Sequence, residues 1–187
     1  MNARELVPTG VAALALLAVA AASAHPVAQG SLDVELTSDA VLLRAEVATE
    51  EAFVASALSP ESAAGSPATL WEEHGRYLVA HLRVYGDERK LDAEIVAVQP
   101  PGSDEGRRAR APVAHDRIVY DVEYALGDPS AGVPRTLRLE QDLLNEIEFA
   151  PGNRWEATFV VGITEPGGRV AEGLLLTSRE PLVYRVG

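Results

Sequence analysis

Residues 117–126, "RIVYDVEYAL", decide the fold, because every second side chain in this stretch is large and apolar. In an extended chain these positions would share one face, and three charged residues would lie on the other face. The apolar set is Ile118, Tyr120, Val122, Tyr124 and Leu126, and the opposite set contains Arg117, Asp121 and Glu123. A repeat of two residues predicts a β-strand with one face buried and the other in water.

The same repeat occurs in segments on both sides of this strand. These segments are residues 32–36, 41–47, 76–86, 91–98, 135–140, 155–163, 172–178 and 181–186. In residues 76–86, the alternation would turn Leu78, Ala80 and Leu82 toward the core and His81 toward solvent. Together the segments predict about nine strands.

Short turn sequences separate several of these segments. Thr37-Ser38-Asp39 is the length of a hairpin turn, and Pro151-Gly152-Asn153 and Pro166-Gly167-Gly168 contain the Gly and Pro that tight turns favour. Neighbouring strands joined in this way run antiparallel, and strands buried on one face need a second layer to cover that face. The sequence therefore predicts an all-β, immunoglobulin-like antiparallel β-sandwich that forms a single domain over residues 25–187.

Two stretches of the chain have helical signals instead. Residues 48–59 offer Thr49 as an N-cap followed by acidic residues, and residues 66–75 place Ser66 before Pro67 and end on a glycine. Both predict short helices. Residues 99–116 are rich in Pro, Gly and charge without any repeat, which indicates a long exposed loop.

The first 24 residues have the composition of a secretory signal peptide. An uncharged run follows Arg4, and Ala22-Ser23-Ala24 is a small-x-small cleavage site. The alternative is an uncleaved membrane anchor, but the apolar run of residues 11–24 is shorter than the roughly 20 residues that span a bilayer. We therefore expect a periplasmic or secreted protein that begins at His25 and has no membrane span in its mature chain.

The composition narrows the function classes. The net charge of −12 argues against nucleic acid as a partner, because binding to phosphates needs clustered Lys and Arg. The chain has no cysteine, which excludes disulfides and thiolate chemistry. Residues 71–75, "WEEHG", lack the second histidine that would complete a zinc pair. The common hydrolase and nucleotide-binding motifs are also missing, so we expect a non-enzymatic protein, with an enzyme of unrecognised type as an alternative.

Cleavage of the signal peptide would make His25 the amino-terminal residue and so create a candidate metal-binding group. An amino-terminal histidine offers its α-amine and a ring nitrogen to Cu(II), and Pro26 has no backbone N–H to compete for the metal. A second ligand would come from His74, His81 or His115, of which His81 on a strand is the best placed. The candidate metal ligands are therefore His25 and His81, for Cu(II) or Ni(II).

Several segments in order resemble a known family. After a leader ending in "AHP", residues 31–47, 76–91, 119–126 and 135–144 are similar to the extracytoplasmic amino-terminal domain of hydrogenase/urease accessory membrane proteins of the HupE/UreJ type. In that family a β-rich domain precedes membrane helices associated with metal uptake, and this sequence ends without such helices. The resemblance, over most of residues 25–186, implies a domain that works beside a membrane transporter or another envelope protein.

The leading hypothesis is thus an exported, non-enzymatic binding or interaction module, accessory to membrane handling of nickel or copper. The second hypothesis is a periplasmic copper-binding protein that uses His25.

Overall fold

The computed structural model describes residues 27–57, 67–103, 116–127 and 132–187. The predicted signal peptide, His25, His115 and most of the predicted loop at 99–116 lie outside these ranges. The first half of the described chain forms β1 (Val27–Leu36), β2 (Ala40–Ala48), α2 (Thr49–Ser56), α3 (Pro67–His81), β3 (Leu82–Gly86), β4 (Arg89–Lys90), β5 (Asp92–Gln99) and β6 (Arg117–Ala125). The second half forms β7 (Thr136–Gln141), β8 (Glu148–Ala150), β9 (Asn153–Arg154), β10 (Glu156–Thr164), β11 (Val170–Leu175) and β12 (Leu182–Arg185).

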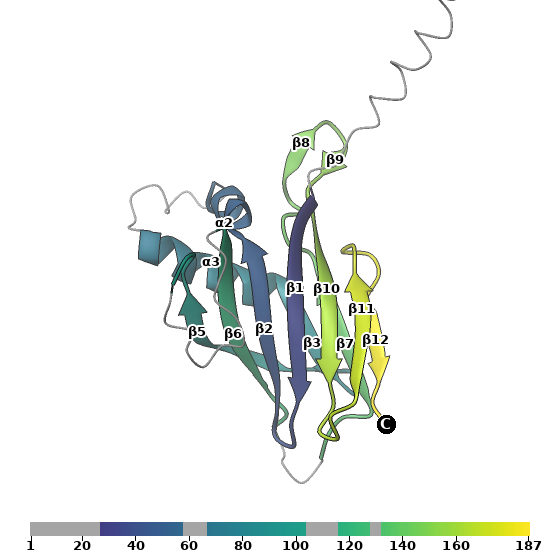
Figure 1. The fold of residues 1–187 in the computed structure, drawn as a ribbon. Coiled ribbons are helices and arrows are strands. Elements are labelled where there is room, and N and C mark those ends of the chain that lie inside the picture. Colours follow the sequence, from purple (N-terminus) through teal and green to yellow (C-terminus); the bar gives the residue numbers. More distant parts are fainter. Residues whose placement is uncertain (1–26, 58–66, 104–115, 128–131) are drawn as a thin grey trace, which may run out of the picture.

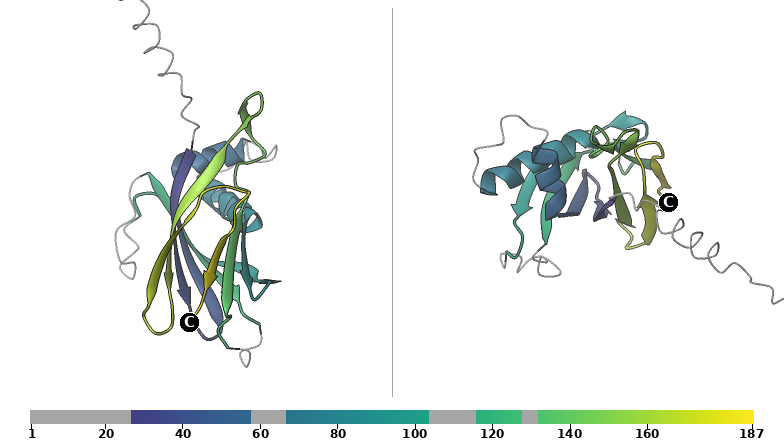
Figure 2. Two further views of the ribbon diagram at one scale, coloured as in Figure 1. Left: turned by 90° about the vertical axis from the view of Figure 1, so that its right-hand side faces the viewer. Right: turned by 90° about the horizontal axis from the view of Figure 1, so that it is seen from above.

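Two sheets face each other and confirm the predicted all-β sandwich (Figure 1). The larger sheet has the strand order β11-β10-β1-β2-β6-β5, and the smaller one has the order β12-β7-β3-β4. Strands β8 and β9 form a separate hairpin. Helices α2 and α3 lie beside the smaller sheet. The two helices and the smaller sheet cover the same face of the six-stranded sheet (Figure 2).

The β6 strand follows the alternation of its sequence and lies inside the larger sheet. Tyr120, Val122 and Tyr124 are buried on its inward face, whereas Glu123 is exposed on the outward face. The Tyr124 hydroxyl donates a hydrogen bond to the carbonyl of Leu82 in the opposite sheet, at 3.1 Å. Burial raises the pKa of Tyr124, so this donor keeps its proton and ties the two layers together.

A second buried polar link joins the sheets at Gln141, the last residue of β7 and the strand partner of Leu82. The Gln141 amide nitrogen donates to the carbonyl of Ala157 in β10 at 2.8 Å, and its amide oxygen accepts from the backbone N–H of Leu143 at 2.9 Å. Gln141 is 1% exposed, so these bonds replace the water that its side chain loses on burial.

Strands β1 and β10 pair in parallel, an arrangement that the sequence pattern did not predict. Leu32 lies opposite Val161, and Val34 lies opposite Ile163. All four side chains are buried, so the inward faces of the two strands form continuous parts of the core. The other strand pairs within the described ranges are antiparallel, as predicted.

The prediction of one strand over residues 76–86 was wrong for its first half. Helix α3 continues to His81, and β3 begins only at Leu82. Ala80, which alternation would bury, is exposed, whereas Trp71, His74 and Leu78 share the buried face of the helix at the three- and four-residue spacing of an α-helix. Helix α3 is therefore longer than the short helix predicted over residues 66–75.

Helix α2 forms close to its predicted position, but Thr49 does not cap it. Thr49 is the first helical residue, and the N-cap position is held by Ala48 without a side-chain hydrogen bond. The acidic Glu50 and Glu51 lie in the first turn, as the sequence predicted. None of the helices in the described ranges combines the length and apolar character that a membrane crossing requires.

Candidate functional site

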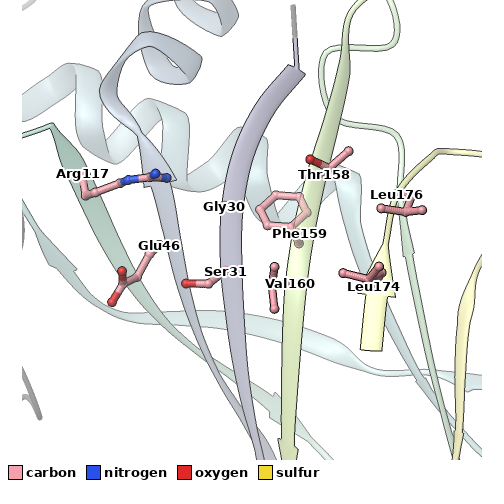
Figure 3. A pocket seen from close by; sticks show the side chains of 9 residues that line it. All are labelled: Gly30, Ser31, Glu46, Arg117, Thr158, Phe159, Val160, Leu174 and Leu176. Carbon is pink, nitrogen blue, oxygen red and sulfur yellow. The ribbon is translucent and has the colours of Figure 1, made fainter. Parts of the chain in front are cut away.

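A recess of about 490 Å³ lies on the outward face of the six-stranded sheet, where β2, β1, β10 and the end of β11 run side by side. The residues that line it are Gly30, Ser31, Glu46, Arg117, Thr158, Phe159, Val160, Leu174 and Leu176. Figure 3 shows the apolar side chains of β10 and β11 on one side of the recess and Glu46 and Arg117 on the other. The site therefore combines an apolar wall with a carboxylate, a guanidinium and hydroxyl groups.

Strand register brings the apolar wall together. Val160 pairs with Leu174 across β10 and β11, and Ser31 of β1 is the partner of Val160 on its other side. Because side chains alternate along a strand, Leu175 is buried in the core while Leu174 and Leu176 face outward. Val160, Leu174 and Leu176 are 56%, 58% and 46% exposed, so three neighbouring apolar side chains lie half in water.

The floor of the recess depends on a glycine beneath an aromatic ring. Gly30 lies opposite Phe159 in the parallel pair of β1 and β10. A Cβ atom at residue 30 would lie 2.6 Å from the Phe159 ring and 2.7 Å from the backbone oxygen of Glu46. Gly30 is therefore required for the ring to lie flat over β1 and close the core below the recess.

The structure places His81, the predicted metal ligand, at the end of helix α3 rather than on the solvent face of a strand. Its Nδ1 atom lies 2.8 Å from Oδ1 of Asp142, and the other carboxylate oxygen accepts a hydrogen bond from Arg83 at 2.9 Å. Burial opposes the charge of Asp142, but the hydrogen bonds from Arg83 and His81 outweigh it and lower the pKa of this carboxyl. Asp142 therefore stays ionised and accepts a hydrogen bond from the Nδ1–H group of His81, which leaves Nε2 as the ring nitrogen open to a ligand.

The ring of Tyr77 lies against His81, with the two ring centroids 4.3 Å apart. The Tyr77 hydroxyl donates to Glu146 at 2.8 Å and accepts the backbone N–H of Leu144 at 2.7 Å. Burial is the main cause of the raised pKa of Tyr77, so this phenol keeps its proton and remains a donor. His81 is thus held by its ring neighbour as well as by Asp142.

His74, a further candidate ligand, is buried between helix α3 and the larger sheet. Its Nδ1 atom lies 2.8 Å from the hydroxyl of Tyr120, which itself donates to the carbonyl of Trp71 at 3.1 Å. Tyr120 has one hydroxyl proton, so His74 Nδ1 must be the donor in the first of these contacts. The other ring nitrogen of His74, Nε2, faces Glu51, whose nearest oxygen is 3.6 Å away.

The Glu51 carboxyl and the Nε2 atom of His74 face each other without another polar partner among the described residues. Both side chains are almost fully buried, and neither the Glu51 oxygens nor His74 Nε2 form a hydrogen bond there. The 3.6 Å contact therefore sets one buried polar group beside another. This pair fastens α2 to α3 and is not open to a ligand.

The structure does not bring together the two predicted metal ligands within its described ranges, because His25 lies outside them. In those ranges no three His, Asp or Glu side chains gather as a metal site would require. His25 with His81 therefore remains a prediction.

The recess itself was not predicted. Its signal in the sequence is the run Leu174-Leu175-Leu176, in which alternation must leave at least one leucine on the outward face. Ser31 and Val160 offer no such signal, because Val160 meets Leu174 through the pairing of β10 with β11, and Ser31 joins them through the parallel pairing of β1 with β10.

Comparisons with known proteins do not assign a family. No family model matches the sequence, and no curated protein is found to be similar to it. The resemblance to HupE/UreJ-type domains therefore remains a prediction from the sequence pattern.

Proposed function

We propose that this chain is an exported, non-enzymatic binding module that docks a partner protein on the outward face of its six-stranded sheet. The observation that carries this proposal is the apolar wall of Val160, Leu174 and Leu176 beside the recess. Neighbouring apolar side chains with a polar border are typical of protein interaction sites.

The shape of the site favours a protein over a small molecule. Pockets for small ligands enclose most of the ligand surface, whereas the wall residues here are about half exposed on a broad sheet. An envelope protein such as a membrane transporter is the partner expected from the resemblance to HupE/UreJ-type domains.

Site-specific photocrosslinking in the native cells tests this docking face. With a photoreactive residue at position 174, we expect a crosslinked product of defined mass that contains an envelope protein, because Leu174 lies at the centre of the wall. The matched control is position 183, since Val183 is also apolar and 54% exposed but lies on β12 of the smaller sheet. Equal products at both positions, or none at 174, would contradict the proposal.

A second candidate function, copper binding by His25 and His81, is favoured by the contact between His81 and Asp142. A histidine ligand commonly donates its second ring N–H to a carboxylate, which orients the ring and raises the basicity of the metal-binding nitrogen. The 2.8 Å contact from Nδ1 to Asp142 has this form and leaves Nε2 available in a partly exposed ring.

Titration of the protein that begins at His25 with Cu(II) tests this candidate. We expect His81→Ala, or one extra residue before His25, to weaken binding at least tenfold, and Asp142→Asn to weaken it about tenfold through the orientation of His81. His115→Ala is the control and should leave the affinity unchanged. A loss with His115→Ala instead, or the same affinity in every variant, would reject His81 as a ligand.

A further inference from the structure

The outward face of β1, β10 and β11 is acidic as well as apolar. Among the outward positions of these strands that the structure describes, none is Lys or Arg, while Asp33, Glu35 and Glu172 are all exposed. None of these three carboxylates takes part in an ion pair formed by the described residues. The nearest cation by register is Arg44 of β2, the strand partner of Asp33, and its guanidinium is paired with Asp121 on its other side. The three carboxylates therefore keep their charge toward solvent at the β1, β10 and β11 end of the face.

The register places these carboxylates in rows beside the apolar wall. Glu172, Gly162 and Asp33 form one row across β11, β10 and β1, next to the row of Leu174, Val160 and Ser31. Adjacent rows on one face are two residues apart along each strand, or about 7 Å. A partner would therefore meet an apolar row and an acidic row at that spacing.

Gly162 leaves a gap in the middle of the acidic row. It has no side chain, and a Cβ atom at this position would lie 3.3 Å from Oδ1 of Asp33, so this carboxylate lies close beside the bare backbone. Glu172 borders the gap from the other side as the strand partner of Gly162. A cationic group that enters between them would approach two carboxylates.

Charge decides which occupant fits this face. Two copies of the chain would bring like-charged acidic rows together, and the net charge of −12 repels both a second copy and an anionic membrane surface. A basic segment of another protein is attracted by the same charges. This inference rests on the docking face proposed above. We infer that the partner presents an extended segment that is both basic and apolar. An apolar side chain of this segment packs against Leu174, and a Lys or Arg two residues away lies between Asp33 and Glu172.

The spacing of the segment follows from strand geometry. Side chains two residues apart on an extended chain lie on one face and are separated by about 7 Å, which matches the distance between the two rows. A peptide with alternating Leu and Lys therefore mimics the segment, and the same peptide with Glu in place of Lys is its matched control.

Binding of these two labelled peptides by fluorescence anisotropy at low salt tests the inference. We expect the Leu/Lys peptide to bind and the Leu/Glu peptide not to bind. Glu172→Lys should weaken binding about fivefold, because an attraction becomes a repulsion, and Leu174→Asp should weaken it about tenfold, because an apolar contact is lost. Added salt should reduce the effect of Glu172→Lys and leave most of the effect of Leu174→Asp.

Glu50→Lys is the control for net charge, since Glu50 is exposed on helix α2 and the substitution changes the total charge equally. Its effect should stay below twofold, and circular dichroism should show all variants folded. Equal losses with Glu50→Lys and Glu172→Lys would mean that only the overall charge attracts the peptide, which overturns the inference.

The outcomes separate this inference from the docking face itself. If the Leu/Glu peptide binds as well as the Leu/Lys peptide and Leu174→Asp weakens both, the docking face stands and the basic partner is wrong. If Leu174→Asp changes the binding of neither peptide and crosslinking at residue 174 also fails, the docking face is wrong. A concentration-dependent dimer that Leu174→Asp abolishes would assign the face to a second copy and overturn the basic partner.

Discussion

Replacement of His74 by leucine is expected to lower the free energy of unfolding by about 3 kcal/mol, because it takes a partner from two buried polar groups at a cost of about 1–3 kcal/mol each. The substitution leaves the Glu51 carboxyl buried without a partner among the described residues, and it removes the donor to the Tyr120 hydroxyl. Urea denaturation followed by circular dichroism measures the change, with the slope of the transition checked for constancy.

The matched control for this prediction is the double variant His74→Leu with Glu51→Leu. Removal of both polar groups abolishes the uncompensated carboxyl, and buried pairs replaced by apolar residues of similar volume are often neutral in stability. We therefore expect the double variant to recover most of the loss. If the loss in the double variant equals the sum of the losses in His74→Leu and Glu51→Leu, the Glu51–His74 contact is not a coupled pair.

Phe159→Ala is expected to destabilise the protein by about 3–5 kcal/mol, because it removes a large ring from the core and leaves a cavity. Phe159 is 1% exposed, and Gly30 beneath its ring has no side chain that could move in to fill the space. For a domain of this size, we expect the melting temperature to fall by roughly 10 °C. Thermal and urea unfolding together check the prediction.

Val160→Ala is the matched control for Phe159→Ala, because it changes the very next residue of the same strand. Val160 is 56% exposed on the outward face, so its truncation should alter the free energy of unfolding by less than about 0.5 kcal/mol. Similar losses at the two positions would contradict the assignment of the inward and outward faces of β10.

The period of two was sufficient to predict the strands of the core. In β6, Tyr120, Val122 and Tyr124 are inward as the pattern required, and the segments predicted at 32–36 and 155–163 form β1 and β10. This signal works because successive side chains of a strand point to opposite faces. When one face is buried, the position of a residue along the strand decides whether its side chain is inward or outward.

The same signal was ambiguous where two periods fit the same residues. Leu78 and Leu82 satisfy alternation, but Trp71, His74 and Leu78 also satisfy the spacing of a helix, and the helix prevails up to His81. The contacts of Trp71, His74 and Gly75 with Tyr120 and Ile95 decide between the two periods, because they bury the helix face against the sheet. Those contacts join residues distant in sequence, so no local pattern contains them.

The sequence alone therefore determined that the chain forms half-buried strands, that these strands need a second layer, and that the chain carries a net negative charge. Only the tertiary structure decided which side chains meet: β1 beside β10 in parallel, His81 against Asp142, His74 against Glu51, and Leu174 with Val160 beside an acidic row. The physical reason is that burial of a single face is a local property of a strand, whereas strand order and register follow from the free energy of the whole packed core.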